Sequence, residues 1–298
     1  MSTGKWTEGA ILAPLTSWQI GGPCRALAEP ETPAELTAAR REAERCGWPV
    51  FLLGAGTNLL IADEGYPGLV VRYAGRGKRI EERGERAIVR AEARMPFAGL
   101  AREVSRAGWS GLVWAEGIPG NVAGATVGNA GAYGGDVAGR IASIEVVLPD
   151  GTEETWEPAR MHYAYRSSAL KGRDPAGPAI VAVSFALDRD DPALLNEQMQ
   201  KLAAQRKSKT PLGASCGCVF RNLPCGPAGK LVEEAGCKGL RRGGAVISPA
   251  HANYIINEGG ARARDVLDLI ATVRERVRQS SGVTLELEIQ LVGFQTAP

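Results

Sequence analysis

The sequence lacks several features that would each assign it to a class of protein. No run approaches 18 apolar residues, so no membrane span is predicted, and the first residues lack the pattern of a signal peptide. The 35 basic and 33 acidic residues give a net charge of +2, and no basic stripe is interleaved with aromatics, so no nucleic-acid partner is expected. An ordinary globular protein of the cytoplasm is therefore predicted, with 44% hydrophobic residues.

Cysteine pairs of the kind that hold structural zinc are also missing. The six cysteines do not form two Cys-x-x-Cys knuckles, so no metal is predicted. Without a secretory signal they are expected to be free thiols in a reducing compartment. Whether the group in the last third has a redox role stays open; it consists of Cys216, Cys218, Cys225 and Cys237.

Glycine, in contrast, is abundant and concentrated in residues 117–135, which read GIPGNVAGATVGNAGAYGG. Neither a helix nor an ordinary strand is expected there, because each ordered glycine costs conformational entropy. A flexible linker is the alternative, but Ile118, Val122, Val127 and Tyr133 are suited to burial. A backbone with bare N–H groups is typical of sites that bind anionic groups such as pyrophosphate.

A second loop of this character follows the apolar run at 50–53. It reads Gly54-Ala55-Gly56-Thr57-Asn58, and a strand followed by Gly-x-Gly suggests a dinucleotide fold. Leu59 stands where a third glycine would be needed, and the turn residues at 63–68 leave no room for a long helix. A Rossmann unit is therefore not predicted, and the two loops together favour one extended ligand held by backbone.

The remaining pattern predicts an α+β protein in three parts, at 1–77, 78–190 and 191–298, with the first 24 residues as a leader. One helix is marked by Thr32 as N-cap, Pro33 at its first position and a capping box completed by Glu35, and ends at Gly47. A cleanly alternating strand is predicted at 285–291. Further strands are predicted at 26–29, 69–72, 80–83, 87–91, 144–148, 153–156 and 179–187, and further helices at 96–107, 191–207 and 263–279.

The order of motifs resembles the UDP-N-acetylenolpyruvoylglucosamine reductase family, in its shorter form without an inserted tyrosine-bearing loop. The resemblance covers nearly the whole chain. The matching segments are IGGP at 20–23, GAGTNLL at 54–60, GIPG at 117–120, GAYG at 131–134, YRSS at 165–168, GCVFRN at 217–222, AGKL at 228–231, HANY at 251–254 and LELEI at 285–289.

This resemblance implies an FAD-binding fold of the vanillyl-alcohol-oxidase type in two subdomains, followed by a C-terminal α+β substrate-binding domain. The flavin would be non-covalent, since no histidine precedes the two loops. NADPH and UDP-N-acetylglucosamine enolpyruvate would be the substrates, in peptidoglycan precursor synthesis, and a monomer is expected. The flavin-binding residues implied are Leu53, Gly54, Ala55, Gly56, Thr57, Asn58, Leu59, Leu60, Gly117, Ile118, Pro119, Gly120, Val122, Gly124, Ala125, Gly128, Asn129, Gly131, Ala132 and Tyr133.

The resemblance also implies roles for three catalytic residues. Arg166 would stabilise negative charge that develops on the substrate, and Glu288 would assist the enol-like intermediate. Cys218 stands where the family usually carries a serine that donates a proton, and a thiol with a reference pKa of about 8.5 can serve. Substrate would be bound by Arg206, Arg221, Asn222, Lys230, His251 and Asn253.

Taken singly, each of these side chains fits a structural role equally well. Cys218 could be a small buried hydrophobe, and Glu288 a solvent-facing acid on a strand. Two other functions stay open: a flavoprotein that oxidises an alcohol with O2, and a non-catalytic module that binds a nucleotide sugar. NADPH consumption that depends on the UDP-sugar would exclude the alcohol-oxidising flavoprotein. Flavin absorption in the purified protein would exclude the non-catalytic module.

Overall fold

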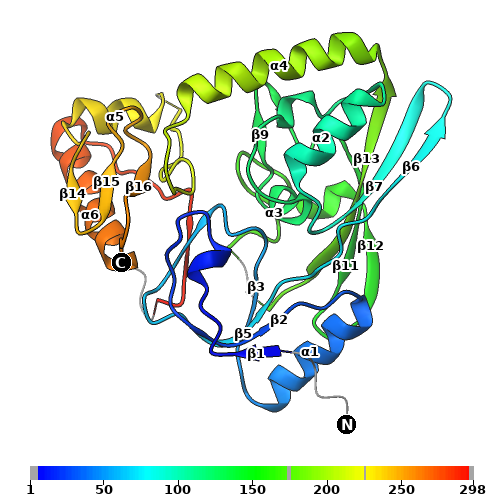
Figure 1. The fold of residues 1–298 in the computed structure, drawn as a ribbon, viewed down its shortest axis with the longest axis horizontal. Coiled ribbons are helices and arrows are strands. Elements are labelled where there is room, and N and C mark those ends of the chain that lie inside the picture. Colours follow the sequence, from blue (N-terminus) through cyan, green and yellow to red (C-terminus); the bar gives the residue numbers. More distant parts are fainter. Residues whose placement is uncertain (1–5, 173–175, 225, 295–298) are drawn as a thin grey trace. The chain divides into compact units, whose positions relative to one another are not determined.

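The chain folds into two compact units, each built from segments that are distant in the sequence (Figure 1). The computed structural model describes residues 6–172, 176–224 and 226–294. Unit 1 comprises residues 1–7, 26–55 and 68–208, and unit 2 comprises residues 8–25, 56–67 and 209–298. The three-part division at residues 77 and 190 stays a prediction, whereas by compactness the helix after residue 190 groups with unit 1.

Unit 1 contains a small sheet covered by one helix. The strand order is β1-β2-β5-β3, and β3 pairs parallel with β5. Helix α1 buries Leu36, Ala39 and Ala43 against the apolar side chains of this sheet. The elements are β1 (Trp6–Glu8), β2 (Cys24–Ala28), α1 (Pro33–Arg45), β3 (Val50–Leu52) and β5 (Tyr66–Val71).

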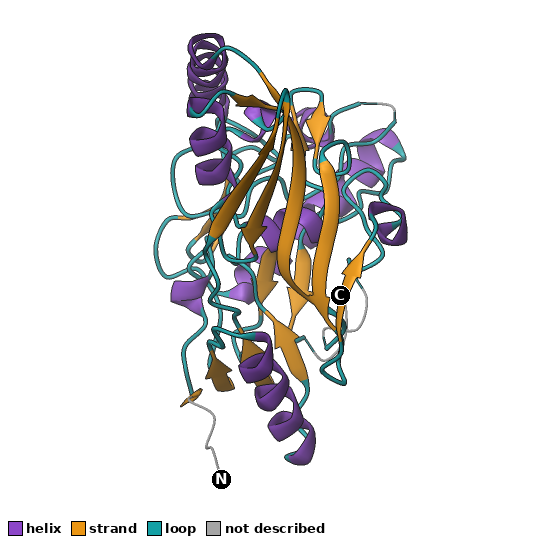
Figure 2. Ribbon diagram, turned by 90° about the vertical axis from the view of Figure 1, so that its right-hand side faces the viewer, coloured by secondary structure: helices purple, strands orange, loops and turns teal. Residues whose placement is uncertain are grey.

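A larger antiparallel sheet forms the rest of the framework of unit 1. Its order is β12-β11-β13-β7-β6, with β8 paired to the end of β13, and its long strands are drawn in Figure 2. The central strand β13 reads AIVAVSFALDR, and this β-branched and aromatic composition suits a strand buried on both faces. The strands are β6 (Lys78–Arg83), β7 (Arg86–Glu92), β8 (Trp109–Ser110), β11 (Ile141–Val147), β12 (Glu153–Trp156) and β13 (Ala179–Arg189).

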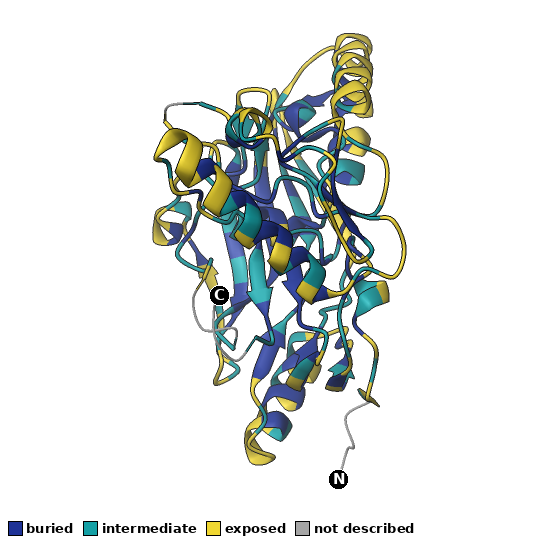
Figure 3. Cartoon of the chain, turned by 90° about the vertical axis from the view of Figure 1, so that its left-hand side faces the viewer, coloured by how far each residue is buried: buried dark blue, intermediate teal, exposed yellow. Residues whose placement is uncertain are grey.

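The main core of unit 1 lies between this sheet and the helices that cover it. Phe97 at the start of α2 packs against Phe185 of β13 and, edge to face, against Trp114, with ring centroids 6.0 and 5.6 Å apart. In Figure 3 most of the strands are dark blue, whereas exposed segments, in yellow, are frequent along the helices. The covering elements are α2 (Phe97–Arg106), η2 (Val113–Ala115), α3 (Val122–Val127), β9 (Gly131–Ala132), β10 (Gly135–Asp136), η3 (Pro158–Met161) and α4 (Pro192–Lys209).

Unit 2 packs helix α6 against a three-stranded sheet in the order β14-β15-β16. Val266, Leu269, Ile270, Val273 and Val277 form the buried stripe of α6 as predicted, and Leu267 is half-buried. The elements are η1 (Ala13–Leu15), β4 (Leu59–Ile61), α5 (Ala228–Glu234), β14 (Arg241–Arg242), β15 (Ala245–Ile247), β16 (Ile255–Asn257), α6 (Ala263–Ser281) and β17 (Gln290–Val292).

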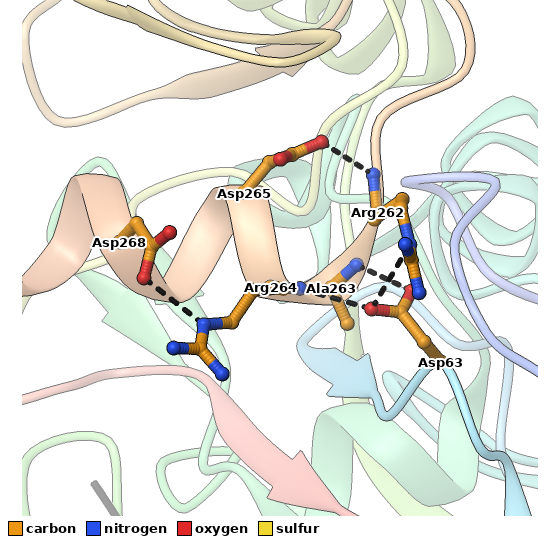
Figure 4. A network of polar contacts seen from close by, with 6 residues as sticks. All are labelled: Asp63, Arg262, Ala263, Arg264, Asp265 and Asp268. Atoms are coloured by element: carbon orange, nitrogen blue, oxygen red, sulfur yellow. Dashed lines mark hydrogen bonds and ion pairs between the residues drawn. The ribbon is translucent and has the colours of Figure 1, made fainter.

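A carboxylate from another segment caps the first turn of α6 (Figure 4). The Asp63 carboxylate accepts hydrogen bonds from the N–H groups of Ala263 at 2.7 Å and Arg264 at 3.2 Å, and lies 3.7 Å from the Arg262 guanidinium. These N–H groups have no partner within the helix, and a negative charge is favourable at a helix N-terminus. Asp63 therefore ties the segment that continues from the 54–60 loop to the longest helix of unit 2.

Several sequence predictions need correction. Residues 8–25 are not a leader but part of unit 2, where Trp18 is fully buried and its Nε1 donates to the Ile255 carbonyl at 2.7 Å. The glycine-rich stretch contains helix α3, which was not expected. The predicted strand at 285–291 is reduced to β17, which pairs parallel with β4, and to an isolated bridge between Leu287 and Phe220.

The helix at 33–45 has the predicted cap with one difference. Thr32 Oγ1 accepts from the Glu35 N–H at 3.2 Å, as expected, but the Glu35 carboxylate accepts from the Glu31 N–H rather than from Thr32. The remaining predicted elements are confirmed to within a few residues of their predicted bounds. Within the described ranges, no helix is long and apolar enough to cross a membrane.

Arg40 of α1 makes a buried contact that we expect to matter for stability. Its guanidinium donates to three carbonyls: Val147 and Leu148, each at 3.1 Å, and Gly177 at 2.6 Å. Arg40→Leu leaves those carbonyls without these donors and is expected to lower the free energy of unfolding by roughly 3 kcal/mol. The neighbouring Arg41 is exposed, so Arg41→Leu should cost less than about 0.5 kcal/mol. Equal losses for the two variants in urea unfolding would contradict this role.

Candidate functional site

The glycine-rich stretch of unit 1 runs through α3 and a tight hairpin. Asn121 is the N-cap of α3, where its Oδ1 accepts from the Gly124 N–H at 3.0 Å. This cap and the small side chains around it let a six-residue helix form despite the glycines. Gly117 and Gly120 have φ of +67° and +115°. Glycine is the residue that adopts such positive φ values readily, which explains its presence at these two positions.

The stretch is fastened to the core of unit 1 on both sides of Gly120. Glu116, only 3% exposed, forms a two-pronged ion pair with Arg102 of α2, which holds the residue that precedes the glycines. The Gly120 carbonyl accepts from Phe97 at 3.1 Å, and the Val122 N–H donates to Met95 at 2.9 Å. The backbone between these bonds is therefore held in a fixed loop and is not a linker.

The first loop reaches the second within unit 1. A side chain at Gly54 would place its Cβ 3.2 Å from Asn121 Oδ1, so the two loops approach each other closely at the start of α3. A Cβ at Gly134 would have no atom within 4 Å. Gly54 therefore lies against the side chain that caps α3, and the open space at Gly134 fits a ligand that main-chain N–H groups bind, as the sequence predicts.

Arg166 lies against the same glycine stretch. Its Nη2 donates to the Gly131 carbonyl at 2.5 Å and its Nη1 to the Asn129 carbonyl at 3.4 Å. Its backbone is left-handed, with φ of +52°, and its own carbonyl accepts from Lys171 Nζ at 2.8 Å. A non-glycine residue held in this region is unusual and is found more often at functional sites than elsewhere.

Arg206 of α4 also reaches the glycine stretch. A Cβ added at Gly117 would lie only 2.6 Å from Arg206 Cδ. Gly117 therefore admits the aliphatic part of Arg206, and a larger residue there would displace it. Unit 1 thus brings together the start of the first loop, the glycine stretch, Arg166 and Arg206.

Unit 2 holds the second half of the first loop. Gly56 packs against the backbone of Leu15, and its carbonyl accepts from the Ser17 N–H at 3.0 Å. After Thr57 and Asn58 comes a strand rather than loop: Leu59 and Leu60, predicted as loop residues, are buried in β4. The absence of a Rossmann helix after Gly56 agrees with the missing third glycine.

Cys218 and Glu288 are neighbours in unit 2. The Glu288 N–H donates to the carbonyl of Val219 at 2.8 Å, which joins two motifs that are 70 residues apart. On its other side, the Glu288 carbonyl accepts from Asn58 Nδ2 at 3.1 Å, and the Gln290 N–H donates to the Asn58 carbonyl at 3.0 Å. The first loop, the candidate proton donor and the candidate acid therefore meet in one network.

The two thiols on either side of Gly217 have different environments. Cys216 is 5% exposed, and burial raises the pKa of its thiol well above the ordinary value, with further upward contributions from Cys218 and Glu288. Cys218 is partly exposed. Gly217 has a φ of +82° with no atom within 4 Å of an added Cβ, so the backbone beside Cys218 is open. Accessibility is what a thiol needs to act on a ligand, and Cys218 has it where Cys216 does not.

The other predicted substrate residues of unit 2 gather around α5. An added Cβ at Gly229, which precedes Lys230, would lie 3.2 Å from His251 Cε1 and 3.4 Å from Asn253 Cβ. Asn222 Oδ1 accepts from the Ala228 N–H at 3.1 Å, at the start of the same helix. Arg221 forms an ion pair with Glu286 at 3.8 Å.

Sequence reasoning missed several residues that hold the site in place. Asn121 could have been found, since asparagine before a run of small apolar residues is a helix-start signal. Glu116, Lys171 and Asp63 had no such signal, because their partners are distant in sequence or are backbone atoms. Cys225 of the predicted cysteine group lies outside the described residues. The other five cysteines are free thiols, and the described residues form no cluster suited to a metal ion.

Comparison with known proteins defines first a class and then a family. Residues 24–156 match the family model described as FAD binding domain, which defines an FAD-dependent protein. Residues 207–292 match the C-terminal domain of UDP-N-acetylenolpyruvoylglucosamine reductase. The reductase of that name from Chloroflexus aggregans is 46% identical over 93% of this chain and 94% of the relative, and that from Rubrobacter xylanophilus is 40% identical over 93% and 92%.

A solved structure agrees with these relatives. The crystal structure of the reductase from Thermus caldophilus is 35% identical, covers 97% of this chain and 98% of its own, and superimposes with a TM-score of 0.81. The chain belongs to the UDP-N-acetylenolpyruvoylglucosamine reductase family. The predicted resemblance and the α+β fold class with an FAD-binding domain are confirmed. The individual site residues stay predictions.

We expect His251 to make the stability of unit 2 depend on pH. Its Nδ1 accepts from the Asn253 N–H at 3.2 Å, which requires an unprotonated Nδ1, and burial lowers the pKa of His251 below its usual 6.5. The unfolded chain therefore binds a proton at His251 more readily than the folded chain does. The free energy of unfolding should then fall as the pH drops through about 6.5, the ordinary pKa of histidine. In urea unfolding between pH 7 and pH 5.5, His251→Gln should lose part of the wild-type decrease, whereas the exposed His162→Gln should not. The same decrease in His251→Gln as in the wild type would contradict this.

Proposed function

We propose that this protein reduces UDP-N-acetylglucosamine enolpyruvate to UDP-N-acetylmuramate with NADPH and bound FAD, a step of peptidoglycan precursor synthesis. Family membership supports the substrates and the cofactor. One structural observation carries the proposal to the level of residues. The Val219 carbonyl and the Glu288 N–H join the candidate proton donor and the candidate acid, although the two lie far apart in the sequence.

FAD bound to this protein would supply hydride transfer from NADPH to the vinyl CH2 carbon of the substrate. The backbones of residues 54–58 and 117–133 would hold the FAD. A side chain at Gly54 would lie 3.2 Å from Asn121 Oδ1, so this position admits only glycine without displacing the cap of α3. The protein supplies no histidine in either loop, so the cofactor is held without a covalent bond through that side chain.

The charged residues have roles that follow from where negative charge develops. Arg166 stabilises the charge on the substrate carboxylate and its adjoining carbon, because a permanent cation in fixed position needs no reorganisation during the reaction. Its anchoring to Gly131 and Asn129 provides that fixed position. Glu288 assists the same carbanionic stage, and Arg206, Arg221, Asn222, Lys230 and His251 bind the nucleotide sugar.

Cys218 completes the reaction by giving its thiol proton to the carbanion. The new C–H bond forms as the S–H bond breaks, and solvent returns a proton to the thiolate. A thiol is mostly protonated at neutral pH, so it starts in the form that can donate. The same exposure that serves this role leaves Cys218 open to alkylation and oxidation.

The proposal places the protein in the cytoplasm, where the nucleotide-linked precursors of this reaction are made, and as a monomer. Sedimentation of the flavin-loaded protein tests the second point. An S-value for a particle of twice the 31.4 kDa chain mass would contradict it.

Flavin binding should depend on the backbone conformation at Gly120. Valine does not readily adopt a φ of +115°, so Gly120→Val should distort the loop and lose the flavin. Gly84→Val is a matched control, because Gly84 also has a positive φ of +64° but lies in the β6–β7 turn. Flavin per protein is measured by absorbance, and acid precipitation should release the colour into the supernatant. Full flavin in Gly120→Val would rule out this loop as the binding element.

The second half-reaction should be lost selectively in three variants. Arg166→Ala, Glu288→Gln and Cys218→Ala should still allow NADPH to reduce the flavin, yet fail to reoxidise it with the enolpyruvyl substrate. Cys218→Ser should keep measurable turnover, and Cys46→Ala, at an exposed thiol of unit 1, should behave as the wild type. Stopped-flow absorbance separates the two halves. Wild-type reoxidation in Cys218→Ala would remove the donor role and leave a structural thiol.

A further inference from the structure

The side chain and the carbonyl of Asn253 bind the two residues that follow Cys218. The side chain is buried, at 1% exposure, and both ends of its amide bind Phe220. Oδ1 accepts from the Phe220 N–H at 2.9 Å, and Nδ2 donates to the Phe220 carbonyl at 2.8 Å. The Asn253 carbonyl also accepts from the Val219 N–H at 2.9 Å.

This geometry differs from the substrate-binding role that the sequence predicts for Asn253. A substrate-binding amide must present its donor or acceptor to the ligand, but this amide is buried and already uses one donor and one acceptor on backbone. The Asn253 side-chain amide bonds both the N–H and the carbonyl of Phe220, as the peptide group of a neighbouring strand would. These contacts therefore hold the backbone of the residues just after Cys218 in place.

The other edge of the same segment is held by residues 286–288. The Val219 carbonyl accepts from Glu288, and the Arg221 N–H donates to the Glu286 carbonyl at 2.9 Å. Phe220 is itself 2% exposed, so its ring anchors the segment in the core of unit 2. On the N-terminal side of Cys218, an added Cβ at Gly217 would have no atom within 4 Å.

We propose that Asn253 is a positioning residue that fixes the Cys218 thiol for proton transfer, by holding Val219 and Phe220 from the side opposite Glu288. The proposal rests on the proposed function for its catalytic consequence. Its structural part, which is the orientation of Cys218, does not depend on the proposed function. Asparagine suits the position because it offers a donor and an acceptor at the spacing of a peptide group. Aspartate lacks the donor and would place a buried charge against the Phe220 carbonyl.

The catalytic test compares Asn253→Ala and Asn253→Asp with the wild type in the two half-reactions. Flavin reduction by NADPH should proceed at nearly the wild-type rate. Reoxidation by the enolpyruvyl substrate should slow by about 10²-fold, the typical effect of displacing a reacting group by about 1 Å. The substrate concentration for half-maximal reoxidation should stay at the wild-type value, because a positioning residue does not contact the substrate. A large rise in that concentration with an unchanged limiting rate would instead assign Asn253 to substrate binding and overturn the proposal.

A matched variant separates positioning from a general loss of stability. Asn257 belongs to the same unit and is also hydrogen-bonded through its side chain, to the Trp18 carbonyl and to the N–H groups of Gly259 and Ala261. None of these partners belongs to the segment after Cys218. Asn257→Ala should lose stability in urea unfolding yet keep both half-reactions. Loss of reoxidation in Asn257→Ala to the same degree would show that the effect is not specific to Asn253.

The orientation of Cys218 can be followed without catalysis. Iodoacetamide alkylation of Cys218 is measured by mass spectrometry in flavin-loaded protein without substrate, with the exposed Cys46 as internal standard. The ratio of the two rates should change in Asn253→Ala and Asn253→Asp and stay constant in Asn257→Ala. An unchanged ratio overturns the proposal. If the ratio changes while wild-type protein itself fails to reoxidise with the enolpyruvyl substrate, the proposed function fails and the positioning inference stands.

Discussion

The hydrogen bond from the Glu288 N–H to the Val219 carbonyl is the contact on which the C-terminal site depends. It closes a loop of about 70 residues and leaves Cys218 and Glu288 as near neighbours. Buried backbone groups must find partners, and the segment after Cys218 finds them on two sides, at residues 286–288 and at Asn253. Asn58 continues the network to the first glycine loop, so the position of one predicted flavin-binding residue is linked to that of Glu288.

Unit 1 meets a different constraint, which is to hold a backbone in place while keeping side chains out of the way. Glycine supplies the open backbone but no packing of its own, and the fixed conformation comes from neighbours. Glu116 pairs with Arg102, Gly120 and Val122 bond to Phe97 and Met95 at the start of α2, and Asn121 caps α3. Arg166 uses two carbonyls of the same stretch, so the conformation of the glycines also determines where that cation lies.

Local patterns predicted the elements whose stability is local. The helix capped by Thr32, the hairpin turned at Gly84 and the buried stripe of α6 were all found from spacing and turn residues. The strand at 285–291 was predicted too long, because alternation in sequence does not provide a neighbouring strand. Only Gln290–Val292 has β4 beside it, and Leu287 contributes a single bridge. Residues 1–24 were predicted as a leader because the partners of Trp18 lie more than 200 residues away.

The sequence by itself determined the family and the α+β class, and it predicted the two flavin loops and the candidate residues Arg166, Cys218 and Glu288, because these depend on motifs that are continuous in the chain. Tertiary structure alone decided which of those motifs touch. It joined Cys218 to Glu288 through Val219, turned the Asn253 amide onto Phe220, and set Asp63 at the start of α6. Each of these contacts satisfies a backbone group whose partner is far away in sequence, and a pattern read along the chain carries no information about such partners.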